Sequence, residues 1–204
     1  MGRNVVAVML MLAAVSTTRA KLYEGAGIVV GAGLSSLNTP LADDYHRRLG
    51  PQAGVMVDLA SSYLRVELHY LQRGQYVETD VVNENGDFLG RYRDDMWADY
   101  LTVPVMVRFI ANLKLANLFI TAGPRMDILL GYAQSSGVYT VLLDESHFQP
   151  VNVGGNWGIG AIVHLHDVTV VPEVRMSYTF NDAYRSQAVS LYPSAIEAVL
   201  GIRF

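Results

Sequence analysis

The sequence predicts an all-β fold: an eight-stranded antiparallel up-and-down transmembrane β-barrel with a packed polar interior. Eight segments alternate apolar with other residues at period two, which is typical of strands with two different faces. Short turns and long polar segments alternate between them. Although 51% of the residues are hydrophobic, no uncharged apolar stretch after residue 20 approaches the roughly 20 residues that a membrane helix needs. Because backbone groups in hydrocarbon must be paired internally, strands can cross a membrane only as a closed barrel.

Residues 1–20 have the order of a secretory signal peptide. Arg3 precedes an apolar run from Val5 to Val15, and small residues follow this run up to Ala20. The run has 11 residues, whereas a helix needs about 20 to span a bilayer. We therefore expect cleavage after Ala20, which divides the chain into a signal peptide at 1–20 and one outer-membrane β-barrel domain at 21–204.

The charge and cysteine content exclude several classes of protein. Residues 1–20 contain two of the 15 basic residues and none of the 19 acidic ones, so 13 basic residues face 19 acidic ones in the mature chain and its net charge is −6. Nucleic acids are bound by basic surfaces, so we expect no nucleic-acid partner. The absence of cysteine excludes a disulfide scaffold and a thiolate metal site.

The order of strands and connections indicates which end of the barrel faces the cell exterior. The expected strands are Gly25–Leu34, Pro51–Leu59, Tyr63–Leu71, Asp99–Ile110, Leu118–Tyr132, Val153–Leu165, Val168–Phe180 and Ser194–Phe204. Short turns are expected at 60–62, 111–117 and 166–167, and long loops at 35–50, 72–98, 133–152 and 181–193. In outer-membrane barrels the short turns are periplasmic and the long loops are extracellular.

Two local features refine this arrangement. The longest loop contains the pair Asn85-Gly86 between alternating apolar residues, which predicts a type I′ hairpin turn and a two-stranded ribbon above the membrane. Pro104 lies in the middle of an expected strand, where it cannot donate a ladder hydrogen bond, so a local bulge is expected there.

The charged face of the strands is expected to line the barrel interior. It carries five arginines and five carboxylates: Asp58, Arg65, Glu67, Arg108, Arg125, Asp127, Glu173, Arg175, Glu197 and Arg203. A confined interior penalises every unpaired charge, whereas a soluble surface needs no such balance. Arginine also suits packed carboxylate pairs, and the two mature lysines, Lys21 and Lys114, lie off this face. Because an eight-stranded barrel is just wide enough for its own side chains, we predict a plug of ion pairs and no channel.

No catalytic, cofactor or metal site is expected. His164 and His166 lie two residues apart at a strand end, but the only other candidate ligand near them in sequence is Asp167. The glycines near residues 25–33 and 154–160 do not open a helix in a βαβ unit, so they do not form a dinucleotide fingerprint. No nucleophile elbow or other hydrolase signature is present.

Several segments resemble a known family. The stretch Tyr100–Phe109 is similar to the "YL-x-(I/V)-P" strand of the PorT-like outer-membrane β-barrel domain common in Bacteroidota. Members of this family are small barrels of the OmpA and OmpX kind. Residues 68–74, residues 118–125 and the Gly158-x-Gly160 strand fit the same pattern in the same order. The resemblance implies the barrel fold and a place in the outer membrane of a Gram-negative bacterium. It implies function less closely, since most members have no assigned role and PorT itself is linked to secretion and gliding machinery.

The C-terminal residues are similar to a signal that the outer-membrane assembly machinery reads. Phe204 ends the chain, and Ile202 and Leu200 share its face of the last expected strand. We therefore expect Leu200, Ile202 and Phe204 to form an assembly signal recognised by the barrel assembly machinery.

These features predict a non-catalytic outer-membrane protein. Its extracellular loops are expected to act in binding, adhesion, or as a scaffold for envelope or secretion components. The expected partners are outer-membrane lipid, the barrel assembly machinery and an envelope or secretion-system protein, with no cofactor. Two alternatives stay open: a porin for small solutes, which needs an open lumen, and a soluble periplasmic lipocalin-like carrier, which needs an apolar cavity.

Overall fold

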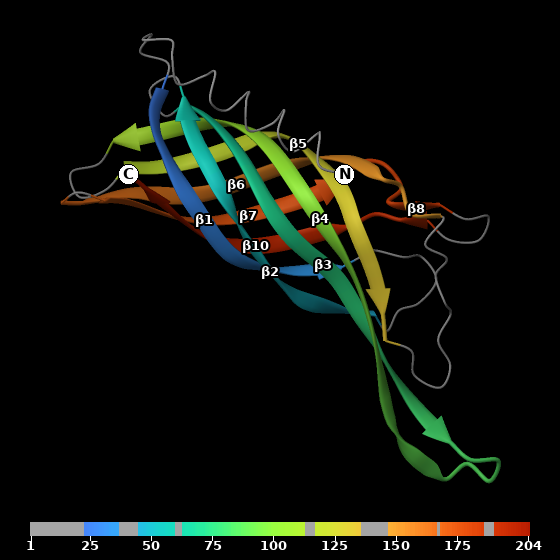
Figure 1. Cartoon of the computed structure of the whole chain (residues 1–204). Coiled ribbons are helices and arrows are strands. Elements are labelled where there is room, and N and C mark those ends of the chain that lie inside the picture. Colours follow the sequence, from blue (N-terminus) through green and yellow to red (C-terminus); the bar gives the residue numbers. More distant parts are fainter. Residues whose placement is uncertain are drawn as a thin grey trace.

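The structure is a computed structural model that describes residues 23–36, 45–59, 63–112, 117–135, 147–166, 168–185 and 190–204. In this part of the chain, eight long strands close into a barrel (Figure 1). They are β1 (Tyr23–Ser36), β2 (Tyr45–Leu59), β3 (Leu64–Val82), β4 (Phe88–Asn112), β5 (Asn117–Gln134), β6 (Val151–Leu165), β7 (Val168–Thr179) and β10 (Ser194–Arg203). The expected signal peptide and its cleavage site at Ala20 lie outside the described residues.

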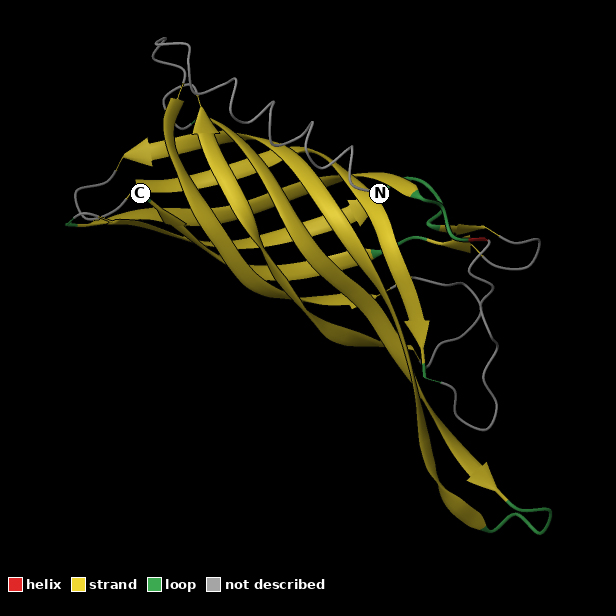
Figure 2. Ribbon diagram, in the orientation of Figure 1, coloured by secondary structure: helices red, strands yellow, loops and turns green. Residues whose placement is uncertain are grey.

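The barrel has the predicted up-and-down topology. Each strand pairs antiparallel with its neighbour along the chain, from β1 to β7 and then β10. β10 pairs with β1 from Gly27↔Arg203 to Ser36↔Ser194, which closes the sheet. Figure 2 shows that strands make up almost the whole barrel wall. The predicted fold class is therefore confirmed.

The strands extend further toward the loop end than the sequence predicts. β3 continues to Val82 and β4 begins at Phe88, although 72–98 was predicted to be a loop. β2 begins at Tyr45, so Arg47 and Arg48 belong to a strand and not to the first loop. The period-two pattern marks only the wall between lipid and lumen, because above it both faces of a strand meet water. Backbone pairing continues there without an apolar face.

The β3–β4 ribbon projects beyond the barrel (Figure 1). Its turn is not the predicted type I′ turn, because Gly86 has a φ of 84° while Asn85 has no positive φ. The amide of Gly86 donates to the Asn83 carbonyl at 3.0 Å, and that of Asn83 donates to the Asp87 carbonyl at 2.9 Å. This is a three-residue loop with glycine in the left-handed region. The Asn83 side chain stabilises it by accepting from the amides of Asn85 and Asp87 at 2.9 and 2.8 Å.

The bulge predicted at Pro104 is wrong. Pro104 pairs with Arg125 in the same register as Val107 with Ala122, so no residue is inserted between them. The β3–β4 pairing skips Val103 and Pro104 and resumes in the same register at Thr102, so the missing amide interrupts that ladder without shifting it. Gly123 lies close to this stretch, where a Cβ atom would overlap the Val105 carbonyl oxygen. The register shift between these strands lies at Asp99 and Tyr100 instead.

The last predicted loop contains further structure. β8 (Tyr184–Arg185) and β9 (Ser190–Leu191) form a short two-stranded sheet at the end of the barrel opposite the C-terminus (Figure 1). Phe148, Tyr184 and Leu191 form a small buried cluster there. The loops after β5 and β7 therefore pack on each other above the barrel.

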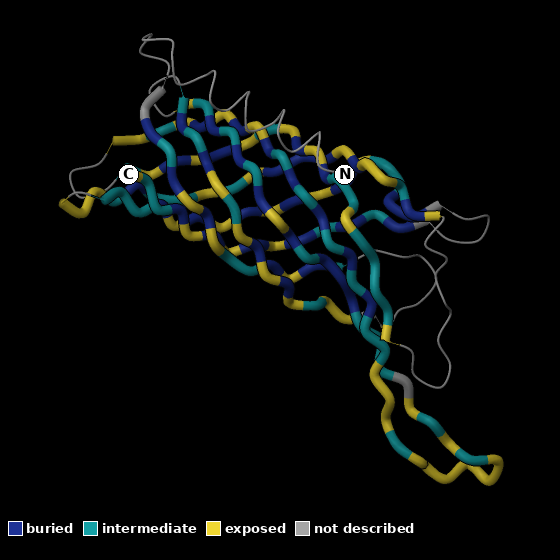
Figure 3. The backbone as a smooth tube through the Cα atoms, viewed as in Figure 1, coloured by how far each residue is buried: buried dark blue, intermediate teal, exposed yellow. Residues whose placement is uncertain are grey.

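The two faces of the wall have opposite chemistry. Figure 3 shows buried and exposed residues alternating along the strands of the barrel. Val107 and Leu200 are 46% and 39% exposed on the outer face, whereas Thr102 and Arg175 are 0% exposed on the inner face. The expected register, with apolar side chains outward and polar side chains inward, is confirmed. No helix among the described residues is long and apolar enough to cross a membrane.

Candidate functional site

All ten side chains expected in the interior lie in the barrel lumen. Nine are buried, namely Asp58, Arg65, Glu67, Arg108, Arg125, Asp127, Glu173, Arg175 and Glu197, and the Arg203 side chain is 14% exposed. They come from six of the eight barrel strands because the period-two alternation points every second side chain inward. The structure joins them into two groups of ion pairs.

The first group centres on Asp58, near the short-turn end of the barrel. Arg65 donates to this carboxylate through two nitrogens, at 2.7 and 3.2 Å. Arg108 and Arg203 contact the same carboxylate at 3.3 and 3.1 Å. Arg108 also stacks on the Phe119 ring, with its guanidinium 4.7 Å from the ring centroid. A single buried carboxylate therefore accepts hydrogen bonds from three guanidinium groups on three different strands.

The same group continues to Arg175, which neutralises two carboxylates. Arg175 donates to both oxygens of Glu67, at 2.6 and 2.7 Å, and its Nε lies 2.8 Å from Glu173. Arg65 lies further from these acids, 3.6 Å from Glu67 and 3.7 Å from Glu173. The His69 ring lies 3.5 Å from Glu67. Arg175 is thus the main partner of both carboxylates.

The second group lies closer to the loop end of the barrel. Arg125 pairs with Asp127, and Arg73 pairs with Glu197 at 3.0 Å. Ser177 donates to Glu197 at 2.9 Å, and Thr102 donates to Asp127 at 2.9 Å. Each acid in this group therefore has both a cationic and a hydroxyl partner, as buried charges require.

Arg73 was missed by the sequence analysis, which placed it in a loop. It lies in β3, is 1% exposed, and makes the network one of six arginines and five carboxylates among the described residues. The prediction that five arginines balance five carboxylates in the lumen is therefore wrong for the described network. The signal was available, because Arg65, Glu67 and His69 lead to Arg73 at the same two-residue spacing.

The residues expected to form the assembly signal lie at the end of β10. Leu200 and Phe204 are 39% and 75% exposed on the outer face, and Ile202 is half-buried. The Phe204 amide donates to the Ala26 carbonyl at 3.0 Å, which holds the chain end against β1. These side chains are accessible from outside the barrel.

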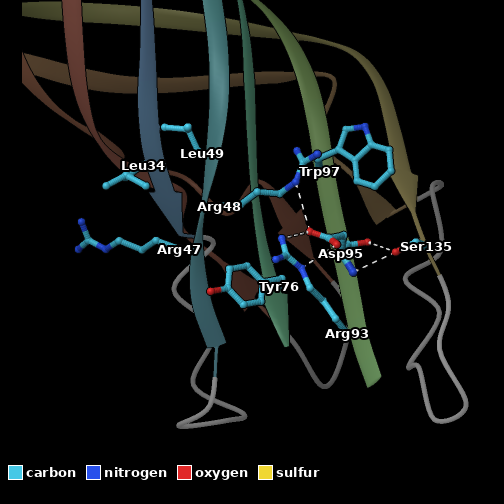
Figure 4. A pocket seen from close by; sticks show the side chains of 9 residues that line it. All are labelled: Leu34, Arg47, Arg48, Leu49, Tyr76, Arg93, Asp95, Trp97 and Ser135. Carbon is cyan, nitrogen blue, oxygen red and sulfur yellow. Dashed lines mark hydrogen bonds and ion pairs between the residues drawn. The ribbon is translucent and has the colours of Figure 1, made fainter. Parts of the chain in front are cut away.

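A second polar site, which the sequence analysis did not find, lies at the loop end of the wall. This rim pocket has a volume of about 590 Å³. Figure 4 shows the side chains that line it: Leu34, Arg47, Arg48, Leu49, Tyr76, Arg93, Asp95, Trp97 and Ser135. Three arginines face a single acid in this set, so the pocket is cationic. Arg47 and Arg48 were expected in a loop, so the contact between Arg48 and Trp97 could not be foreseen.

Contacts between the side chains fix the geometry of the rim pocket. Arg93 donates to both oxygens of Asp95 at 2.9 Å, and Arg48 lies 3.4 Å from the same carboxylate. The Arg48 guanidinium lies 4.6 Å from the centre of the Trp97 ring, and that of Arg93 lies 3.8 Å from the Tyr76 ring. The hydrogen bonds that Arg93 donates to Asp95 raise the pKa of Arg93 above its ordinary value. Both guanidinium groups are therefore oriented by a carboxylate and an aromatic ring.

The upper ribbon, residues 78–94, has two edges without a neighbouring strand among the described residues. β2 pairs with β3 only as far as Val77, and β5 pairs with β4 only as far as Met96. Large apolar side chains are exposed near its tip, where Phe88 and Leu89 are 63% and 61% exposed. Open strand edges beside exposed apolar side chains are a template for pairing with another chain.

Ion pairs stiffen the upper ribbon. Arg91 donates to Asp80 at 2.7 Å, and it lies 3.7 Å from Glu78. The hydrogen bond from Arg91 lowers the pKa of Asp80 below its ordinary value. These groups are exposed, so the pairs shape the ribbon more than they stabilise the barrel.

Of the two histidines considered as metal ligands, His164 lies near the end of β6 and His166 lies in the turn that follows. His164 contacts the Thr169 hydroxyl at 3.1 Å, and His166 occupies the turn with a φ of 47°. Within the described ranges, no group of three or more histidine, aspartate or glutamate side chains is arranged to hold a metal ion.

Comparison with known proteins identifies the family. The model described as "Outer membrane protein beta-barrel domain" matches residues 20–185. The chain belongs to this family. This outer-membrane β-barrel protein therefore resides in the outer membrane, and that location is inconsistent with the soluble carrier alternative. A search of curated proteins found no match.

Two solved structures are similar to this barrel. One is Ail, the attachment invasion locus protein of Yersinia pestis, in complex with the heparin analogue sucrose octasulfate; it is 12% identical over 89% of this chain and 99% of that chain, with a TM-score of 0.43. The other is Neisserial surface protein A, which is 11% identical over 89% of this chain and 99% of that chain, with a TM-score of 0.48.

Proposed function

We propose that this protein is a non-catalytic surface receptor or scaffold, which binds an extended segment of another protein through the upper ribbon. The observation that carries the proposal is the combination of open strand edges and exposed apolar side chains on a ribbon that projects from the barrel. An extended segment adds to such an edge through main-chain hydrogen bonds, and apolar side chains give the contact its specificity.

The packing of the lumen favours binding outside the barrel over transport of solutes through it. Arg65, Arg108 and Arg175 are each at most 1% exposed and are held by buried carboxylates from other strands, and the pair of Arg175 in β7 with Glu67 in β3 spans the lumen. A path for solutes would require these pairs to separate, which is costly for buried charges. Planar-bilayer recordings are therefore expected to show no stable conductance, and a sustained large conductance would favour the porin alternative.

The resemblance to the PorT-like domain makes a secretion or envelope assembly in Bacteroidota the proposed setting. The partner is then a component of that assembly, reached above the membrane. Outer-membrane lipid and the barrel assembly machinery are the other proposed partners, and the latter would read Leu200, Ile202 and Phe204. The proposed precursor carries the signal peptide at 1–20.

Site-specific photocrosslinking in intact cells tests the proposal. A photoreactive phenylalanine analogue replaces Phe88 in the upper ribbon, and the same analogue replaces Phe109 as a matched control. Both side chains are 63% exposed, but Phe109 lies on the wall near the short-turn end. We expect a discrete protein adduct at Phe88 that is absent at Phe109.

A second variant distinguishes strand addition from simple apolar contact. Changing Phe88 and Leu89 to serine removes the apolar side chains and keeps the strand edges, so it is expected to weaken a crosslink placed at Tyr92 without abolishing it. Absence of any protein adduct at Phe88 and Tyr92 would refute binding through the upper ribbon. An adduct of equal yield at Phe109 would show that the reaction is non-specific, and it would refute the proposal equally.

A further inference from the structure

The rim pocket lies where the apolar wall meets the polar ribbon. Leu34 and Leu49, 46% and 63% exposed, lie toward the loop ends of β1 and β2 and border the pocket. Beyond the pocket, the ribbon carries the charged residues Glu78, Asp80 and Arg91. In an outer-membrane barrel, this transition from apolar to charged side chains marks the level of the lipid headgroups.

Two of the pocket's arginines have nitrogens available to a ligand. The Nε of Arg48 contacts Asp95 and its Nη1 donates to Gln72 at 2.8 Å, while its Nη2 has no partner among the described side chains. Arg47 is exposed, and no carboxylate of the described residues pairs with it. Figure 4 shows Arg47 on the Leu34 side of the pocket, across from Trp97. Cationic donors thus face the pocket from two sides.

From this geometry we propose that the rim pocket binds the phosphate of a lipid in the outer leaflet. Arg48, held by Asp95, Gln72 and the Trp97 ring, donates to the phosphate from one side, and Arg47 does so from the other. Planar guanidinium groups donate well to phosphate oxygens, and orientation in advance lowers the entropic cost of binding. The acyl chains of the same lipid lie along Leu34 and Leu49 and the apolar wall below them.

The charge and shape of the pocket favour a lipid over a soluble anion. Three arginines and one aspartate line it, so it carries a net positive charge, although the mature chain is acidic overall. Leu34 and Leu49, which line it, are exposed apolar side chains of the wall. A phosphate anchored in the headgroup layer reaches these arginines without leaving the membrane. The proposal does not depend on the upper ribbon binding a protein.

Binding of lipid A to the folded full-length mature barrel tests the proposal. The barrel is embedded in phosphatidylcholine nanodiscs that contain either diphosphorylated lipid A or its dephosphorylated form. Trp97 supplies the signal, because Arg48 lies over its ring, and a Trp157→Phe background removes the other tryptophan. Native mass spectrometry counts the lipids retained by each variant.

The variants separate the pocket from a general effect of charge. Arg47→Gln with Arg48→Gln removes both proposed donors, and Arg47→Gln alone leaves the contacts of Arg48 with Asp95 intact. Arg91→Gln, on the exposed part of the ribbon, is the matched control for loss of one positive charge. Heat-modifiable mobility on gels verifies that each variant is folded.

We expect the affinity for phosphorylated lipid A to fall at least tenfold in the double variant, as loss of charge-assisted hydrogen bonds predicts, and about threefold or more in Arg47→Gln. Arg91→Gln should bind as the wild type does, and dephosphorylated lipid A should bind weakly to every variant. Equal affinity for the two lipids, or an equal loss in Arg91→Gln, would overturn the proposal. Displacement of lipid A by inorganic phosphate at the same phosphate concentration would show a site for a soluble anion and would overturn the lipid assignment.

Discussion

Replacing Arg175 by alanine removes the main partner of two buried carboxylates. Arg175 contacts Glu67 at 2.6 and 2.7 Å and Glu173 at 2.8 and 2.9 Å. After its loss, Arg65 remains at 3.6 Å from Glu67 and 3.7 Å from Glu173. Arg65 is itself bound to Asp58, but Asp58 keeps Arg108 and Arg203 as partners, so Arg65 can move part of the way toward one of the two acids.

The expected cost follows from these contacts. Removing one member of a buried pair typically destabilises a protein by about 3 to 5 kcal/mol, because the other charge stays buried. Two carboxylates lose their short contacts here, and Arg65 compensates in part, so we expect Arg175→Ala to lower the free energy of unfolding by about 4 kcal/mol. Arg91→Ala is the control, because Arg91 forms its ion pairs on the exposed ribbon and should contribute little.

Urea unfolding of the barrel in lipid vesicles measures this difference, with tryptophan fluorescence as the probe. Adding Glu173→Gln to Arg175→Ala removes one of the unpaired charges and should restore part of the loss. If Arg175→Ala cost less than about 1 kcal/mol, as an exposed pair does, the charged face would have to be in contact with water. The assignment of the lumen as a closed ion-pair network would then be wrong.

Three further predictions follow from the wall, the N-terminus and the ribbon. Val105→Arg should cost about 2 to 4 kcal/mol if it meets lipid near the midplane, and Thr102→Arg, which enters the lumen, should respond differently; equal unfolding free energies would reject the register. Mass spectrometry of the envelope form should find a chain that begins after Ala20, and an intact N-terminal peptide would contradict cleavage. The pair of Arg91 with Asp80 should persist at neutral pH and be lost only as the pH falls through the lowered pKa of Asp80, below its ordinary 3.8. In the Arg91→Gln variant, the midpoint of a carbon-13 NMR titration of the Asp80 carboxyl should therefore move back toward 3.8. An unchanged midpoint would exclude the pair.

The part of the fold that could be predicted from the sequence is the barrel wall, because its two faces meet different environments, lipid outside and the lumen inside. Between lipid and lumen, alternation places Val107 outward and Arg108 inward, and it needs no knowledge of partners. Arg73 lies beyond the point where the outward face stops being apolar, since Gln72 and Gly74 flank it, and its place in the lumen was missed for that reason. The rim pocket was missed because it joins β2 to β4 across a distance that no local pattern encodes.

The hairpin turn shows a different limit. The Asn85-Gly86 pair favours a type I′ turn on its own, but the side chain of Asn83 captures two amides of the loop and selects another geometry. The turn type depends on a residue outside the pair, so the dipeptide locates the turn without defining it.

The lumen contacts have a consequence for how the barrel closes. Arg203 and Asp58 are 145 residues apart along the chain, Arg73 and Glu197 are 124 apart, and Arg175 and Glu67 are 108 apart. An open sheet that lacks β7 and β10 would therefore present β3 to the membrane with Glu67 and Arg73 still lacking these partners. Such an intermediate is unfavourable in hydrocarbon, so insertion should proceed as one concerted event in which the seam between β1 and β10 seals and the charges pair together. A chain that stops short of β10 should stay outside the bilayer. The requirement that these charges pair thereby prevents the insertion of incomplete barrels.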